Sequence, residues 1–170
     1  MTPTSPKISL TKPKSPLRVA MEARDIHAVA AAFAGDAVFH SPLTEQFVFR
    51  GRDQIGPLLQ VIFDAFEDFR YTDELYDERA GFLVARARIG GRDIEIVDHM
   101  LFGPDGGIVD FTVFFRPFPT AAAALRVIGA ALGRLKSPAL AATISALSYP
   151  LATMARLGDS VSVSLLRPTS

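Results

Sequence analysis

The stretch IGPLLQVIFDAF, residues 55–66, carries the clearest helical pattern in this sequence. Its large apolar side chains recur at steps of three and four residues, which places them along one face of a helix. They are Ile55, Leu58, Leu59, Ile62, Phe63 and Phe66. Because such a stripe must pack on an apolar surface, we predict a helix that begins between Asp53 and Pro57 and lies on a β-sheet.

The residues that follow supply this sheet. Four runs rich in Phe, Val, Ile and Tyr are separated by residues that favour turns. The runs cover residues 69–79, 81–89, 93–102 and 108–116. Gly90 and Gly91 suit a tight hairpin, and GPDGG at residues 103–107 suits a longer turn. We therefore expect an antiparallel meander.

Two shorter helices are expected ahead of the central one. The first covers residues 17–24, and the side chain of Asp25 is placed to cap the second. The apolar positions of the second helix share one face. They are Ile26, Val29, Ala30 and Phe33. Gly35 and Asp36 are expected to end this helix.

A short strand at residues 37–40 should then stop at Ser41 and Pro42, because proline removes a backbone donor and restricts the residue before it. A loop to Gly51 is expected to follow. Helices first and a meander after them predict an α+β fold, in which a curved antiparallel sheet wraps round the N-terminal helices.

Alanine and leucine dominate residues 119–158. The apolar positions there alternate steps of three and four, so we predict a hairpin of two helices that turns near residues 136–138. Pro150 should kink the second helix. Residues 137–155 carry no charge and approach the shortest length of a membrane span. A central proline and several hydroxyl groups favour packing on the domain or on a second subunit over membrane contact.

The chain is long enough for one domain with a sizeable core. We expect this domain at residues 17–118, followed by the helical hairpin at residues 119–158. Residues 1–16 are rich in Pro, Ser, Thr and Lys and lack the apolar core of a signal peptide, so we expect a flexible tail. Residues 159–170 are expected to form a second tail.

Charge and cysteine content narrow the possible functions. The chain has 18 Lys and Arg residues and 18 Asp and Glu residues, so it has no positive excess to bind nucleic acid. It has no cysteine, which excludes disulfides and thiolate nucleophiles and fits a cytoplasmic location. Three histidines and scattered carboxylates do not specify a metal site, and no phosphate-binding glycine loop precedes a helix. No metal and no cofactor are therefore expected.

Two short motifs resemble a known superfamily. DAVFHSP, residues 36–42, follows the first helices, and VDHMLF, residues 97–102, leads to GGIV at residues 106–109. They resemble the SnoaL-like and ketosteroid isomerase-like branches of the nuclear transport factor 2 superfamily, over about residues 17–117. The resemblance implies a cone round an apolar pocket for a small molecule. It leaves the activity open, because this fold hosts isomerases, cyclases, dehydratases, epoxide hydrolases and proteins without catalysis.

The resemblance preserves one of three catalytic positions of the ketosteroid isomerases. Their general base, an aspartate before the motif proline, falls on Ser41, and their oxyanion-hole tyrosine falls on Leu17. Their second oxyanion donor, a protonated aspartic acid, falls on Asp98. Epoxide hydrolases and SnoaL-type cyclases carry an acid late in the last strand, but no acid lies near Val113. Asp110 is expected on the opposite face of that strand.

The residues themselves also single out Asp98. It shares a strand face with Ile96 and Met100, where burial should raise its pKa. A carboxylate with a purely structural hydrogen bond is the alternative. His40 could act as the base across the cavity from Asp98, or be a hydrogen-bonded histidine at a strand end. Tyr71 could offer its phenol to the cavity.

The expected ligand is a small, largely apolar molecule of steroid, terpenoid or polyketide type, bound by protonated Asp98. The remaining expected ligand contacts are Ser41, Phe63, Met100, Phe111, Val113 and Phe115. An enzyme of this kind would transfer a proton next to a carbonyl, in isomerisation, dehydration or cyclisation, with His40 as base. The alternative is a non-catalytic carrier or assembly module. In either case we expect a homodimer that forms through the outer sheet face, the hairpin, or both.

Overall fold

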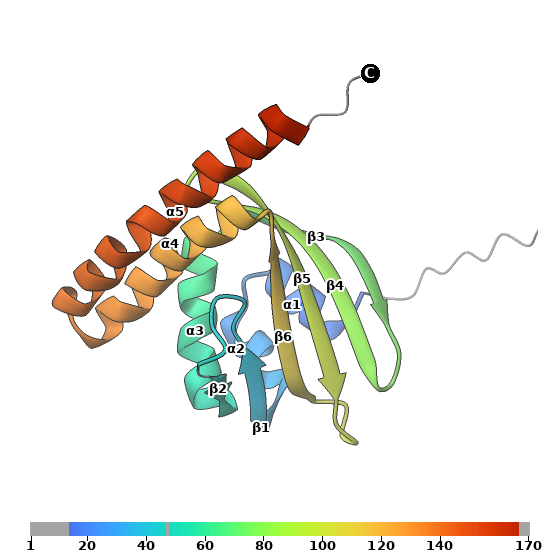
Figure 1. Ribbon diagram of the computed structural model, residues 1–170. Coiled ribbons are helices and arrows are strands. Elements are labelled where there is room, and N and C mark those ends of the chain that lie inside the picture. Colours follow the sequence, from blue (N-terminus) through green and yellow to red (C-terminus); the bar gives the residue numbers. More distant parts are fainter. Residues whose placement is uncertain (1–13, 47, 167–170) are drawn as a thin grey trace, which may run out of the picture.

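The computed structural model describes residues 14–46 and 48–166 (Figure 1). Most of the tail predicted for residues 1–16, and the last four residues of the second tail, lie outside these ranges. The helices and strands follow in the order α1 Pro16–Glu22, α2 Ile26–Ala31, β1 Phe33–His40, β2 Val48–Arg50, α3 Gly51–Ala65, β3 Glu67–Tyr76, β4 Ala80–Ile89, β5 Arg92–Phe102, β6 Ile108–Arg116, α4 Phe118–Lys136 and α5 Pro138–Leu166.

The strands form one six-stranded sheet in the order β2-β1-β6-β5-β4-β3. Strands β3 to β6 make the predicted antiparallel meander. Strand β1 pairs with β6 in parallel, so the sheet is mixed and the expectation of a wholly antiparallel sheet is wrong. The reason is that β2, α3 and strands β3 to β5 lie between β1 and β6 in the chain, and so long a connection allows β6 to run beside β1 in the same direction.

Strand β1 begins at Phe33, earlier than the predicted strand at residues 37–40, and α2 ends at Ala31 rather than at Gly35. Phe33 pairs with Ile108 of β6, and its buried ring lies 5.3 Å from the ring of Phe111, centroid to centroid. Pairing with β6 therefore outweighs the helical periodicity of the local sequence. Strand β2, which pairs with β1, lies where we expected a loop.

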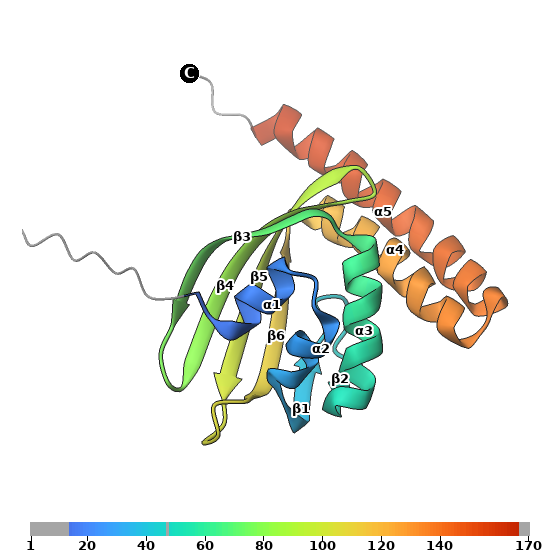
Figure 2. The same cartoon turned by 180° about the vertical axis from the view of Figure 1, so that it is seen from behind.

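The sheet curves round the three N-terminal helices to form a cone (Figures 1 and 2). Helix α3 begins at Gly51, slightly ahead of the predicted start, and packs on β1 and α2. It buries most of the predicted stripe, although Ile62 is only partly buried and Phe66 follows the end of the helix. The cap of α2 is confirmed, since the side chain of Asp25 accepts hydrogen bonds from the backbone amides of His27 and Ala28. The α+β cone predicted from the sequence is therefore confirmed.

The C-terminal helices form the predicted hairpin, with α4 against the cone and α5 on its far side (Figure 1). Helix α4 packs on α3 and on strands β4, β5 and β6, and Ala124 and Ile128 belong to the main core. Helix α5 continues without interruption through Pro150 and past residue 158. Of the described helices, only α4 has the length and hydropathy of a membrane span, and here it packs on the domain.

Removal of the Phe33 ring should test the junction between β1 and β6. The ring is fully buried, so Phe33→Ala should lower the free energy of unfolding by roughly 3–5 kcal/mol. Urea titration followed by circular dichroism measures this loss. Phe118→Ala is the control, because that ring is 67% exposed and its loss should cost less than about 1 kcal/mol. Equal losses in the two variants would contradict the buried junction.

Candidate functional site

A cavity of about 310 Å³ lies between the concave face of the sheet, the N-terminal helices and α4. Its wall is apolar except for Ser41, Thr44 and Asp98, among the residues that the structure describes. Small-molecule sites have volumes of about 300–1,000 Å³, so this cavity suits one small ligand. The wall also requires that most of the ligand be apolar.

Asp98 reaches this cavity because of its place on β5. Along this strand, buried and more exposed side chains alternate, and Ile96, Asp98 and Met100 share the buried face, as predicted. The backbone of Asp98 lies between Leu83 of β4 and Val113 of β6, so two neighbouring strands hold it in place. The residue is only 4% exposed.

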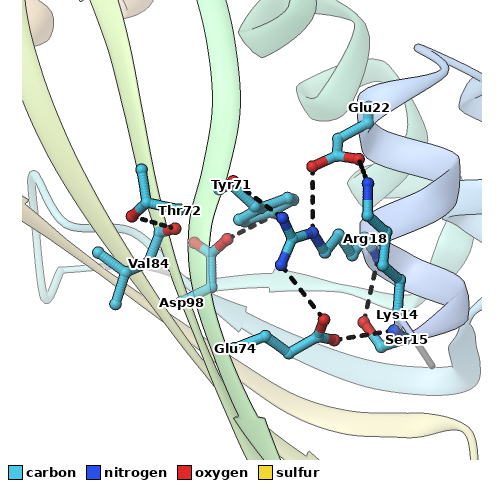
Figure 3. Close-up of polar contacts among 9 residues, drawn as sticks. All are labelled: Lys14, Ser15, Arg18, Glu22, Tyr71, Thr72, Glu74, Val84 and Asp98. Atoms are coloured by element: carbon cyan, nitrogen blue, oxygen red, sulfur yellow. Dashed lines mark hydrogen bonds and ion pairs between the residues drawn. The ribbon is translucent and has the colours of Figure 1, made fainter. Parts of the chain in front are cut away.

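The phenol of Tyr71 donates a hydrogen bond to Oδ2 of Asp98 at 2.9 Å (Figure 3). Tyr71 lies on β3, two strands away from β5, and is as deeply buried as Asp98. We expected this phenol to face a ligand, but Tyr71 is not part of the cavity wall. A buried hydroxyl needs a partner, and here the partner is the carboxyl of Asp98 rather than a ligand.

Burial changes the acidity of both groups. Desolvation raises the pKa of Asp98 from 3.8 to about 7, and the hydrogen bond from Tyr71 opposes this rise by favouring the ionised form. Burial and the nearby Asp98 raise the pKa of Tyr71 well above its usual value. At neutral pH the phenol therefore keeps its proton, whereas the carboxyl of Asp98 is present in both its neutral and its ionised form.

A polar network fixes α1 beside this pair (Figure 3). Arg18 of α1 donates a hydrogen bond to the backbone oxygen of Tyr71 at 3.0 Å and forms ion pairs with Glu22 and Glu74. The backbone amide of Ser15 donates to the same Glu74 side chain at 2.9 Å. This network holds α1 against β3, and α1 contributes Leu17 and Met21 to the cavity wall.

The structure does not bring His40 to Asp98. The ring Nε2 of His40 lies 2.9 Å from Oδ2 of Asp110, and both side chains are partly exposed to solvent. Phe39, the residue before His40, is the one that lines the cavity. Since neighbouring residues on a strand point to opposite faces, His40 lies on the outer face and cannot reach a ligand inside the cone. Asp110 lies outside the cavity wall, as expected.

The other predicted ligand contacts divide into two groups. Four of them line the cavity: Ser41, Phe111, Val113 and Phe115. Phe63 does not, because its ring lies under the guanidinium of Arg24, 5.5 Å from the ring centroid. Met100 is buried in the core over Gly81.

The sequence analysis missed the contribution of the C-terminal hairpin to the wall. The hairpin residues that line the cavity are Leu125, Ile128, Gly129, Leu132 and Ile144. Their helical spacing predicted an apolar face, but the spacing does not specify which surface that face covers. Within the described ranges, no group of three or more His, Asp or Glu side chains could hold a metal ion.

The SnoaL-like domain model matches residues 17–130 and so extends into α4. A crystal structure of a steroid delta-isomerase from Pseudomonas aeruginosa is 30% identical, with a TM-score of 0.64, over 70% of this chain and 88% of that one. An uncharacterised protein from Silicibacter pomeroyi with a cystatin-like fold is 25% identical, with a TM-score of 0.65, over 73% of this chain and 85% of that one.

An NTF-2 like protein of unknown function from Burkholderia xenovorans shares the fold at 21% identity, with a TM-score of 0.52, over 61% of this chain and 80% of that one. No curated protein sequence matches this chain. The family match covers well over half of the chain, and the steroid delta-isomerase shares its cone-shaped architecture. The chain therefore belongs to the SnoaL-like domain family, within the ketosteroid isomerase-like fold.

Proposed function

We propose that the cavity binds a small, largely apolar molecule and that Asp98 contacts a carbonyl or hydroxyl oxygen of this ligand. The supporting observation is a single acid in an otherwise apolar cavity of about 310 Å³. Oδ2 of Asp98 accepts from Tyr71, which leaves Oδ1 of the neutral carboxyl to donate to the ligand. The related steroid delta-isomerase favours a ligand of steroid size, and terpenoids and polyketides of similar polarity also fit this description.

The same carboxyl supports proton-transfer chemistry without a cofactor. A general acid or base works best when its pKa is near the working pH, and the pKa of Asp98 is about 7. Near neutral pH part of the protein carries neutral Asp98, which donates to the ligand, and part carries ionised Asp98. In the ionised part the carboxylate accepts a proton from the carbon next to a carbonyl and, now neutral, returns that proton elsewhere on the same molecule. The reaction would be an isomerisation, a dehydration or a cyclisation. His40, on the outer face, has no part in it.

A non-catalytic carrier or assembly module is the second candidate. The outer sheet face exposes large apolar side chains, namely Phe82, Leu101 and Phe114, and α5 exposes Leu147 and Met154. Such surfaces favour burial against a partner. A homodimer through the outer sheet face would bury the first group and leave the cavity accessible as a carrier site.

Burial of Asp98 should make the folded protein less stable as the pH rises from about 4 to about 7. In this window the carboxyl loses its proton in the unfolded chain but keeps it in the folded protein, so ionisation favours unfolding. At lower pH both states are protonated and the penalty is absent. The total loss in the free energy of unfolding should be on the order of a few kcal/mol.

Urea titrations at stepped pH measure this loss. Asp98→Asn should remove the pH dependence between about 4 and 7. Asp93→Asn is the matched control on the same strand, since its side chain is 98% exposed, and it should keep the wild-type pH dependence. Tyr71→Phe should extend the loss of stability to higher pH, because it removes the hydrogen bond that favours ionised Asp98. An unchanged slope in Asp98→Asn would show that another group is responsible.

Progesterone, an apolar steroid ketone, is the binding probe for the proposed site. Asp98→Leu removes the donor and should weaken progesterone binding by roughly tenfold in equilibrium dialysis. Asp98→Asn keeps a donor but cannot exchange a proton. It should retain binding, yet lose more than about a hundredfold of any isomerisation of a β,γ-unsaturated ketosteroid.

His40→Ala is the control and should leave both measurements unchanged, because His40 lies outside the cavity. A wild-type protein that binds progesterone without turnover would favour the carrier. Equal affinity in wild type and Asp98→Leu would refute the role of Asp98.

Sedimentation velocity tests the homodimer. The wild-type chain should sediment as a dimer at micromolar concentration. Phe114→Glu should yield a monomer, because the carboxylate that replaces this exposed ring would be buried at the interface. Leu147→Glu on α5 should leave the dimer intact if the sheet face is the interface. A monomeric wild-type protein would exclude the assembly role.

A further inference from the structure

We propose that the C-terminal hairpin sets the length of ligand that the cavity accepts, and that Ile144 is the residue that ends the cavity. This inference rests on the proposed function, because it assumes that the cavity holds a ligand. Its first support is the position of Ile144, which lies on α5 and yet forms part of the cavity wall. Helix α5 lies beyond residues 17–130, the part that the SnoaL-like domain model covers.

Ile144 reaches the wall because Gly129 of α4 has no side chain. A Cβ atom at Gly129 would lie 3.0 Å from Cγ2 of Ile144, which is closer than ordinary van der Waals contact. Gly129 lines the cavity as well. The missing side chain therefore leaves a gap in the inner helix, and the side chain from the outer helix fills it.

The two helices are held in this arrangement by a second close approach. A Cβ atom at Gly133 would lie 3.0 Å from both the backbone nitrogen and the Cα of Ala141. The turn is also fixed, since the side chain of Ser137 accepts a hydrogen bond from the amide of Leu140 at 3.1 Å. Backbone contact at this point leaves α5 little freedom to shift along α4, so the position of Ile144 is well defined.

This geometry specifies the shape of the ligand. The hairpin lies across one end of the cone (Figure 1). Asp98 lies in the middle of β5, which covers residues 92–102. A ligand whose oxygen contacts Asp98 can extend its apolar body toward the hairpin until it meets Ile144. The favoured ligand class is therefore a molecule with an oxygen function near one end and an apolar body of limited length.

Straight-chain primary alcohols from hexanol to hexadecanol are suitable probes, with affinities measured by isothermal titration calorimetry. Wild-type affinity should rise about fourfold with each added methylene and stop rising at a limiting chain length. Ile144→Ala should move this limit to longer alcohols, and Ile144→Val should move it less. Gly129→Ala should move it to shorter ones. Leu147→Ala is the matched control on the same helix, since Leu147 is 73% exposed, and it should keep the wild-type limit.

Asp98→Leu separates the two proposals. One outcome is that alcohols bind wild type at least several-fold more tightly than Asp98→Leu, but Ile144→Ala keeps the limiting chain length of wild type. This outcome would overturn the role of the hairpin and leave the proposed function in place. If no alcohol binds wild type, this inference is overturned, and the progesterone measurement decides the proposed function separately. If the alcohols bind wild type and Asp98→Leu equally, the contact between Asp98 and the ligand oxygen is refuted together with this inference. Circular dichroism of each variant establishes that it is folded. If Ile144→Ala does not fold, the limiting chain length of Ile144→Val decides whether the hairpin sets the ligand length.

Discussion

The polar contacts in the interior of this protein depend on the buried carboxyl group of Asp98. The cavity wall offers Asp98 almost no polar surroundings, so its ionised form is disfavoured and its neutral form is retained up to neutral pH. One hydrogen bond from Tyr71 prevents the group from being left without a partner. Tyr71 is in turn positioned by β3, to which Arg18 anchors the first helix. A chain of contacts thus connects the first helix of the domain to the buried carboxyl at its centre.

The walls of the hollow come from separate parts of the chain. The sheet provides one side, the N-terminal helices and α3 the other, and the hairpin of α4 and α5 closes an end. Large aromatic rings line the hollow but also pack on one another, as Phe39 does on Phe111 with centroids 5.2 Å apart. The rings thereby support one another along the cavity wall, beside an open volume of about 310 Å³.

Periodicity in the sequence was enough to predict much of this structure. The stripe of α3, the meander and the buried face of Asp98 each depend on neighbours close in sequence, and each was predicted. The start of β1 at Phe33 was not, because an apolar residue at that spacing fits a helix as well as a strand paired to β6. The hydrogen bond between Tyr71 and Asp98 was also missed, since it spans two strands and depends on the curvature of the sheet.

The parallel pairing of β1 with β6 has a consequence for the order of folding. The strands of the meander are joined by short turns. In contrast, β1 pairs with a strand about 70 residues later in the chain, as the pairing of His40 with Thr112 shows. Closing such a long loop has a high entropic cost, which slows this step of folding, so we expect β1 to pair with β6 last. Phe39 of β1 and Phe111 of β6 stack on each other across this pairing, and the hollow is complete only when the two strands have paired. A small molecule that binds the completed hollow should therefore bind the folded chain in preference to partly folded chains, and its binding should stabilise the folded state.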